Sequence, residues 1–267
     1  LPEVETIRRG LERKLVGSTI VGMEVFERRL RRPLDVRSLR SIVGRRVVAV
    51  TRRAKYLLLH LGEGVVWLLH LGMSGSVVVA RGGGPRGAHE HVRVRFDPEA
   101  VLRYSDPRRF GLMRVGREAE LVELRGLGVE PLGDGLDASW LHRRLRATRR
   151  EVKAALLDQR VVAGIGNIYA SEILHRAGVR PTRRGVRLRR CETERIAAAI
   201  RNVLSEAVER RGTSFSDYFD SDGVPGTFQT VLGVFDRAGL PCPVCGAKVK
   251  RRLHGGRSSF YCPACQK

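Results

Sequence analysis

The strongest constraint on the fold is a cysteine pattern at the C-terminal end of the sequence. Cys242, Cys245, Cys262 and Cys265 follow the spacing C-x2-C-x16-C-x2-C. Two close pairs of thiolates suit a tetrahedral Zn²⁺ ion and leave no open coordination position, so we predict one structural zinc ion. Two disulfides are the alternative, which the reducing environment of a cytosolic protein disfavours. The fifth cysteine, Cys191, is interpreted as an ordinary free thiol.

The segment between the two cysteine pairs contains HGGRSSF, in which Arg257 is flanked by small residues. A metal-bound hairpin fixes the position of what it displays, and an arginine on a rigid tip is well suited to binding a phosphate. The spacing thus predicts zinc directly, and Arg257 suggests a nucleic-acid contact.

The charge of the chain indicates the same kind of partner. Its 267 residues carry a formal net charge of +22, and a globular chain this basic usually binds a polyanion, by default nucleic acid. The alternative is a generally basic surface without a specific partner. The sequence has no apolar run of membrane-spanning length and no leader-like start, so we interpret it as soluble and not secreted. Only six of the 50 basic residues are lysines, which singles out Lys55 and Lys153.

Hydrophobic periodicity separates a β-rich part from a helical part. The first 15 residues place apolar side chains on one face of a helix. Between 18 and 116, short β-rich runs without intervening helices favour a sandwich or a barrel. In HVRVRFD we expect His91, Arg93 and Arg95 to point outward and the apolar residues inward.

Helical patterns follow a glycine-rich linker at 126–139. They occur around Trp140, in REVKAALLDQ and over 196–208. In VVAGIGNIYASE a glycine-rich turn leads into another helix near Asn167, which geometrically favours an anion site at the helix N-terminus. The alternative is a plain helical corner with an asparagine cap, although Lys153 on the preceding helix could converge on the same phosphate.

Two turn-like stretches carry large side chains. HLGMSG contains Met73, and SDPRRFG contains Arg108 and Phe110 after a turn-initiating Asp106-Pro107 pair. In a basic protein, these side chains could enter a duplex and fill the space left by an extruded base. A core position for Met73 and Phe110 is the alternative. Lys55, at the mouth of a strand, could likewise be a solvated lysine.

Taken together, these stretches resemble the formamidopyrimidine-DNA glycosylase family of bacterial base-excision repair enzymes. The matches follow the family's order and spacing over nearly the whole chain: LPEVET, RRAKYL, HLGMSGS, YSDPRRFG, LLDQRVVAGIGNIYASE, SDGVPGTFQ and the zinc hairpin.

The resemblance implies an α+β multidomain fold with DNA in a cleft. We expect four parts: an N-terminal helix and β-sandwich at 1–125, a linker at 126–139, a helix–two-turn–helix domain at 140–236, and a zinc-finger hairpin at 237–267. The helix–two-turn–helix domain would include a lesion loop at 214–229. It also implies a bacterial cytoplasmic, nucleoid-associated monomer that removes 8-oxoguanine and formamidopyrimidines from duplex DNA. The strand would then be cleaved at the abasic site by β,δ-elimination.

The resemblance also assigns roles to particular residues. Within the sequence, the catalytic residues would be Lys55 and Arg257. DNA contacts would come from His89, Arg108, Arg149, Lys153, Asn167 and Arg257. The extruded base would be replaced by Met73, Arg108 and Phe110. The lesion pocket would include Glu3, Glu172, Ser216 and Tyr218.

The start of the sequence departs from the family pattern. Family members begin Pro-Glu-Leu-Pro-Glu-Val-Glu-Thr, and the terminal proline amine is the nucleophile. The sequence begins at the Leu of this motif, so Pro2-Glu3 is the second Pro-Glu pair and not the catalytic one. We expect Pro-Glu to precede Leu1 in the active enzyme. The chain from Leu1 onward is expected to recognise DNA without its nucleophile and its principal acid/base glutamate.

Two other functions remain open at this point. A protein of the same fold could bind lesions or DNA without catalysis. An endonuclease VIII-like relative could act on oxidised pyrimidines, although LPEVET and the Arg-Arg-Phe turn weigh against it.

Overall fold

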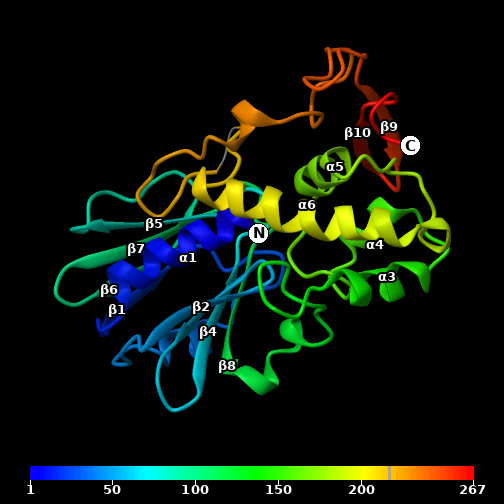
Figure 1. Cartoon of the computed structure of the whole chain (residues 1–267). Coiled ribbons are helices and arrows are strands. Elements are labelled where there is room, and N and C mark those ends of the chain that lie inside the picture. The colour runs from blue at the N-terminus through cyan, green and yellow to red at the C-terminus, as the bar shows by residue number, and fades with distance from the viewer. Residues whose placement is uncertain (216–217) are drawn as a thin grey trace. The chain divides into compact units, whose positions relative to one another are not determined.

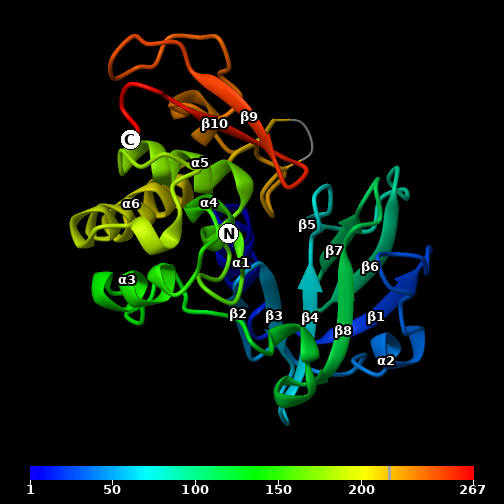
Figure 2. The same ribbon diagram turned by 90° about the vertical axis from the view of Figure 1, so that its right-hand side faces the viewer.

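The computed structural model describes residues 1–215 and 218–267 and divides into two compact units (Figure 1, Figure 2). We name them by their main content. The sandwich unit comprises Pro2–Arg125 and Arg210–Gln229. The helical unit comprises Leu1, Gly126–Glu209 and Thr230–Lys267.

Two antiparallel four-stranded sheets form the sandwich unit, with strand orders β1-β6-β7-β5 and β2-β3-β4-β8. Both sheets contribute to one hydrophobic core, which includes Trp67, Phe96 and Tyr104. This confirms the sandwich. Its strands are β1 (Ile20–Val25), β2 (Ala49–Arg53), β3 (Tyr56–His60), β4 (Val65–His70), β5 (Ser76–Arg81), β6 (Glu90–Phe96), β7 (Ala100–Ser105) and β8 (Leu112–Arg117).

The leading helix, α1 (Pro2–Leu15), packs on this core through the predicted apolar face. Ile7, Leu11 and Leu15 are fully buried. Acidic residues occupy its first turn and basic residues its last turn, which favours the helix dipole. The other helical elements between residues 16 and 125 are α2 (Val36–Arg40) and the 3₁₀ turns η1 (Glu118–Glu120) and η2 (Val122–Leu124).

The expected alternation along β6 is wrong at two positions. Arg95 is exposed, but His91 and Arg93 are buried. The pairing of β6 with β7 shifts register between Glu90 and Val92, which breaks the alternation of faces at His91. Arg93 lies in the regular part of the strand, and its guanidinium is covered by the loop whose Gly84 and Pro85 carbonyls accept from it. His91 Nε2 lies 2.7 Å from the carbonyl oxygen of Asp106, whereas its buried Nδ1 has no hydrogen-bond partner among the described residues. Arg93 Nε donates to the Glu90 carboxylate at 2.6 Å.

The helical unit contains the helices that the sequence predicts, and a two-stranded hairpin. Asp137 caps the first of them, because its carboxylate accepts the backbone N–H of Trp140 at 2.7 Å. No helix among the described residues has the length and apolar character needed to cross a membrane. The elements are α3 (Ala138–Arg146), α4 (Val152–Leu157), α5 (Asn167–Arg176), η3 (Gly185–Arg187), α6 (Arg190–Glu209), β9 (Lys250–His254) and β10 (Arg257–Tyr261), and a further 3₁₀ turn is η4 (Phe228–Val231).

Two segments belong to units of the structure that differ from the domains expected from the sequence. The linker at 126–139 belongs to the helical unit, where the N–H of Gly128 donates to the carbonyl of Gln159 at 2.8 Å. The segment that contains the 214–229 loop groups with the sandwich unit, where the N–H of Val79 donates to the carbonyl of Ser221 at 3.0 Å. Backbone pairing of this kind leaves no periodic signal in the sequence.

Candidate metal centre and nucleic-acid interface

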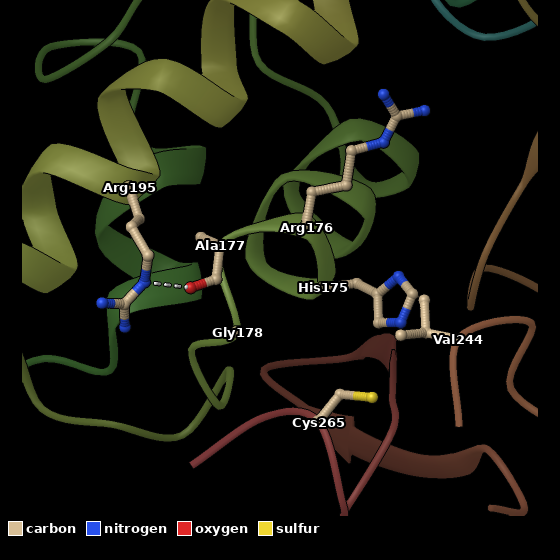
Figure 3. A pocket seen from close by; sticks show the side chains of 7 residues that line it. All are labelled: His175, Arg176, Ala177, Gly178, Arg195, Val244 and Cys265. Atoms are coloured by element: carbon tan, nitrogen blue, oxygen red, sulfur yellow. Dashed lines mark hydrogen bonds between the residues drawn. The ribbon is translucent and has the colours of Figure 1, made fainter. Parts of the chain in front are cut away.

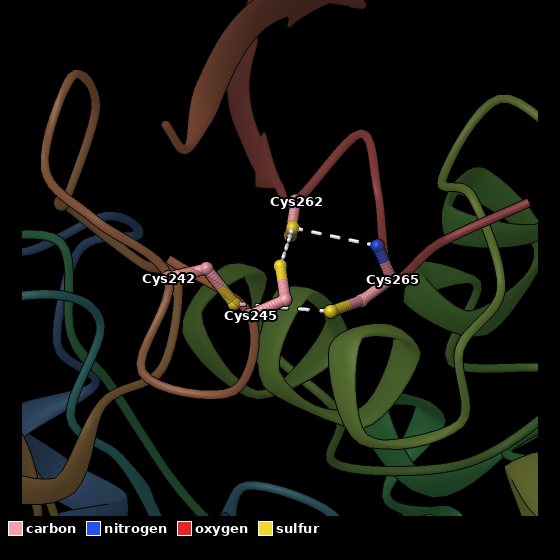
Figure 4. A group of neighbouring side chains, drawn as sticks. All are labelled: Cys242, Cys245, Cys262 and Cys265. Carbon is pink, nitrogen blue, oxygen red and sulfur yellow. Dashed lines mark hydrogen bonds between the residues drawn. The ribbon is translucent and has the colours of Figure 1, made fainter. Parts of the chain in front are cut away.

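The four predicted zinc ligands come together at the base of the β9–β10 hairpin (Figure 4). Their sulfur atoms all lie within 4.8 Å of one another, and no disulfide joins any cysteine in the described part of the chain. Four thiolates bound about 2.3 Å from a tetrahedral zinc ion would lie about 3.8 Å apart. The Cys245–Cys262 and Cys242–Cys265 sulfur distances of 3.4 and 3.9 Å bracket that value. The cluster therefore fits Zn²⁺, and the predicted structural zinc site is confirmed.

The hairpin is joined to the helices by two polar side chains that converge on one carbonyl group. Lys153 Nζ, on α4, donates to the carbonyl of Ser258 and to Ser259 Oγ, both at 3.0 Å. Asn167, at the start of α5, donates its Nδ2 to the same carbonyl at 3.1 Å. Arg257, next in sequence to that carbonyl, is exposed. We call these four groups, Lys153, Asn167, Arg257 and Ser258, the cradle.

The ammonium group of the cradle is buried without an acidic partner. Lys153 is 4 % exposed, and none of the ion pairs found among the described residues involves it. Burial, and next the positive charge of Arg257, lowers the pKa of Lys153 to about 8. Asn167 Oδ1 is also buried and has no hydrogen-bond partner in the described structure. An anion at this place would stabilise the charged form of the lysine.

A cavity of about 550 Å³ opens beside the cradle. Lys153, Arg257 and Ser259 line it together with Arg149, which the family resemblance had assigned to DNA contacts. Arg150, Arg184 and the acidic Glu151 and Asp158 complete the charged lining, and Arg150 forms an ion pair with Asp158 at 2.9 Å. Five basic residues thus face two acidic ones, and this excess of positive charge suits an anion better than a neutral ligand.

In the sandwich unit, Met73 and Phe110 are not part of the core. Met73 is 73 % exposed and Phe110 is 47 % exposed. The guanidinium of Arg108 lies 5.3 Å from the centre of the Phe110 ring. The core alternative that the sequence left open is therefore wrong for both residues. We call the two turns that carry these three side chains the wedge turns.

A buried carboxylate holds both wedge turns. Asp106 Oδ1 accepts the hydroxyl of Ser74, next to Met73, at 2.7 Å. Asp106 Oδ2 accepts the N–H of Gly111 at 2.8 Å and the Tyr104 hydroxyl at 3.1 Å. Asp106 is fully buried, and no ion pair found among the described residues includes it.

Close packing also joins the turns. Gly72, in the first turn, has a φ of +66°, and a Cβ atom there would lie 2.6 Å from the backbone carbonyl carbon of Phe110. Only glycine fits such a contact, so the turns form one rigid surface.

Lys55 is half-buried and follows Ala54, which adopts a φ of +54° in the β2–β3 turn. Its charge contributes to the environment of His70 on β4. Burial, and next the charge of Lys55, lowers the pKa of His70 to about 4, so this imidazole is neutral near pH 7. Its Nδ1 accepts the N–H of Gly72 at 3.0 Å. His70 thus helps to fix the turn that presents Met73.

Two of the residues predicted for the lesion pocket are in contact. Glu3 Oε1 accepts the N–H of Thr213 at 3.2 Å, and the Tyr218 hydroxyl donates to the carbonyl of Glu3 at 3.3 Å. Burial, followed by the charge of Glu3, raises the pKa of Tyr218. These bonds tie α1 to the 214–229 loop. Ser216 lies outside the described residues.

The assignment of Glu172 to the lesion pocket is corrected by the structure. Its side chain is 1 % exposed, and its carboxylate accepts three consecutive backbone N–H groups, those of Gly233, Val234 and Phe235, at 2.8–3.1 Å. Both oxygens are engaged in holding the segment that leads to the zinc hairpin. Its position in the family motif gave no sign of this structural role.

His89 remains a candidate for a phosphate contact. It is exposed at the end of the β5–β6 loop and has a φ of +56°. The sequence reasoning overlooked Asp106 as an anchor, since Asp-Pro was interpreted only as the start of a turn. It also overlooked Ser259 and the Glu90–Arg93 pair. Alternating sequence periods do not reveal such buried polar partners.

Comparison with known proteins agrees with this architecture. Three family models match in order: the formamidopyrimidine-DNA glycosylase N-terminal domain at 1–113, its H2TH domain at 127–218, and a zinc finger found in FPG and IleRS at 239–267. A sandwich, a helical module and a zinc finger in this order define a class of DNA glycosylases.

Whole-chain similarity identifies the family. The formamidopyrimidine-DNA glycosylase of Halorhodospira halophila is 46 % identical over 270 residues, covering 100 % of this chain and 99 % of that protein. A crystal structure of MutM (FPG) from Thermus thermophilus is 40 % identical, with a TM-score of 0.89 over 100 % of this chain and 98 % of that one. A complex between Lactococcus lactis Fpg and abasic-site DNA is 30 % identical, with a TM-score of 0.92 over 100 % and 99 %. The chain belongs to the formamidopyrimidine-DNA glycosylase family.

Proposed function

We propose that this protein is a base-excision repair DNA glycosylase and AP lyase that removes 8-oxoguanine and formamidopyrimidines from duplex DNA. The observation that supports it most is the cradle, in which a buried ammonium, a helix N-terminus and an exposed arginine meet on one strand of a zinc hairpin. Solved relatives from Lactococcus lactis are complexes with abasic-site DNA and with DNA containing Fapy-dG. We infer that it acts as a monomer in the bacterial cytoplasm, associated with the nucleoid.

The cradle supplies the DNA-backbone contacts in this proposal. Lys153 and the N-terminal amides of α5 bind one phosphate, and Arg257 and Arg149 bind its neighbours along the strand. His89 contributes a further contact from the sandwich unit. Phosphate contacts fix position and register but carry no sequence information.

The wedge turns perform the extrusion step. Removing a base from the stack costs a few kcal/mol, and the enzyme must offset this cost. Phe110 and Met73 stack against the exposed neighbouring bases. Arg108 hydrogen-bonds the cytosine left without its partner, because a guanidinium matches the acceptor groups on that base.

The extruded base is read at the 214–229 loop. Glu3 and Tyr218 tie this loop to α1, so a base received here would be held near the start of the chain. Ser216 stays a prediction, and Glu172 is not part of the proposed pocket because its carboxylate is already engaged.

The chemistry requires an amine nucleophile, which the family takes from a proline before Leu1. An α-amine titrates near pH 8, so a useful fraction is neutral at pH 7. Its attack on the sugar C1′ breaks the bond to the base, which leaves. After the nitrogen loses its proton, its lone pair opens the sugar ring at the C1′–O4′ bond, so that O4′ becomes a hydroxyl group and a Schiff base forms at C1′. The iminium acidifies the C2′ proton, whose loss breaks the C3′–O bond. Lys55 contacts the DNA and assists this elimination.

Borohydride trapping on an 8-oxoguanine duplex tests the proposal. Two forms are compared. One starts at Leu1, and in the other Pro-Glu precedes Leu1 and the proline carries the free terminal amine. We expect only the extended form to give a covalent adduct and a cleaved strand, and both forms to bind the lesion duplex.

The same assay distinguishes the rival functions. If the extended form binds the duplex but forms no adduct, the protein is a non-catalytic lesion binder. If it forms an adduct with a thymine glycol duplex in preference to 8-oxoguanine, the endonuclease VIII-like alternative is correct.

A further inference from the structure

Helix α5 carries two side chains that face the zinc hairpin, Glu172 and His175. They are three residues apart and therefore lie on the same face of the helix. Glu172 holds the backbone that leads into the hairpin, as described above. His175 reaches the metal cluster itself, because its Nε2 lies 3.5 Å from Cys242 Sγ and both residues are buried.

The imidazole ring of His175 is held in one place. A Cβ atom on Gly233 would lie 2.7 Å from His175 Nδ1 and 2.8 Å from its Cε1, so the ring packs directly against the glycine backbone. In Figure 3, His175 lies with Val244 and Cys265 along a pocket formed between α5 and the hairpin. The segment that Glu172 anchors thus restricts the movement of the ring on the side of Gly233.

We propose that His175 is a positioning residue of the zinc centre, which donates its Nε2–H to the Cys242 thiolate. A zinc-bound sulfur is a thiolate and can only accept, so the neutral imidazole must carry its proton on Nε2. His175 is not a fifth ligand, since four cysteines complete a tetrahedral shell. Groups that hydrogen-bond a ligand commonly change metal affinity by about 10- to 100-fold.

This contact gives α5 a second role. Its first residue, Asn167, holds the hairpin at Ser258, and its last turn holds the metal ligand Cys242. One rigid helix therefore fixes the hairpin at two places, and the contact joins zinc retention to the geometry of the cradle.

Zinc release to a chelator tests the proposal without any use of enzymatic activity. His175→Phe keeps a ring but no donor, whereas His175→Gln can place an amide N–H near the original Nε2. Val244→Ala, in the same pocket but 74 % exposed, is the matched control. With EDTA and a chromogenic zinc indicator, we expect release to be about 10- to 100-fold faster from the Phe variant. The Gln and Ala variants should release zinc at nearly the wild-type rate.

Two results would overturn the proposal: a wild-type release rate for His175→Phe, or equally fast release from the Phe and Gln variants, which would mean that the ring only fills space. A measurement on the unmutated zinc-loaded protein removes any dependence on variant folding. The ¹⁵N chemical shifts of His175 must show the proton on Nε2, and a proton on Nδ1 would refute the hydrogen bond.

Discussion

The cradle and the wedge turns each depend on one buried charge, but the charges have opposite sign and different supports. Lys153 is a cation whose protein partners are a carbonyl and a hydroxyl of the zinc hairpin. Asp106 is an anion whose partners are an amide and two hydroxyls of its own sandwich. Neither charge has a counter-ion among the ion pairs of the described residues.

The difference lies in what each charge still lacks. The carboxylate of Asp106 accepts three hydrogen bonds, which largely replace the water that it gave up. The ammonium of Lys153 has neutral acceptors only, and burial lowers its pKa. The wedge turns are therefore complete in the free protein, whereas the proposed function supplies the cradle with a counter-charge only when a DNA phosphate binds.

Removal of zinc should separate the two regions most strongly. Without the metal, the four cysteines no longer close the base of the hairpin, and the contacts of Lys153 and Asn167 with Ser258 do not by themselves keep Arg257 in place, so the cradle loses its geometry. The proposed phosphate contacts of Lys153 and Arg257 are charge-assisted and contribute about 1.5–3 kcal/mol each. Losing both should weaken duplex binding by at least about 100-fold. Fluorescence anisotropy with a labelled duplex, before and after chelation and after zinc is restored, measures the change.

The sandwich should not respond to the chelator, because it has its own core. Trp67 is fully buried there, and in a Trp140→Phe background it is the only tryptophan left. Its emission should stay blue-shifted when zinc is removed. A shift to the emission of exposed tryptophan would show that the two regions do not depend on separate supports.

Replacing the buried anion should instead affect the sandwich. Asp106→Asn keeps the shape but removes the charge, so three hydrogen bonds to a carboxylate become weaker bonds to a neutral amide, and the Ser74 hydroxyl must turn to accept the new N–H group. Hydrogen bonds to charged groups contribute about 1.5–3 kcal/mol and neutral ones about 0.5–1.5 kcal/mol, so the free energy of unfolding should fall by about 1–3 kcal/mol. Denaturant unfolding followed by Trp67 fluorescence reports it. The exposed change Asp134→Asn removes the same charge and should be nearly silent. Equal behaviour of the two variants would show that Asp106 is not an anchor.

Asp106 also shows how far the sequence could predict this molecule. The zinc ligands, the leading helix, the sandwich and the helix starting at Asn167 follow from spacing and periodicity, which depend on residues near in sequence. The roles of Asp106 and Glu172 depend on which amides lie opposite them after folding. Glu172 meets Gly233, 61 residues away, and no local pattern encodes that distance. The family motif indicated that Glu172 has a role, but it did not show whether the side chain lines the lesion pocket or holds the segment that leads to the zinc hairpin.

Truncation of the aromatic wedge tests whether the wedge turns act on DNA. Stacking of a base on an aromatic ring is worth about 1–3 kcal/mol, so Phe110→Ala should weaken lesion-duplex binding about 5- to 100-fold. Single-stranded DNA needs no extrusion and should bind almost unchanged. Melting should hardly change, because the ring is exposed. Equal losses on duplex and single strand would contradict a wedge. Arg257→Ala should instead weaken all duplexes alike, and Arg108→Ala should blur the preference for the opposite base.

The smallest expected effect is a pH dependence that comes from the incomplete cradle. Because the pKa of Lys153 is about 8 in the free protein, phosphate binding above that pH requires proton uptake. Duplex affinity should therefore fall as the pH rises from 7.5 to 9, by up to about eightfold for one proton.

Protein stability should change in the opposite direction. An unfolded lysine titrates near about 10.4, so between about pH 8 and 10.4 the unfolded chain holds a proton that the folded chain has lost, and this residue's contribution to stability rises with pH. Lys153→Gln should abolish both slopes, and the Lys14→Gln variant, whose ammonium has an ion pair with Asp222, should keep both. If Lys153→Gln retains the wild-type pH dependence of affinity, the cradle lysine is charged throughout and the contrast with Asp106 fails.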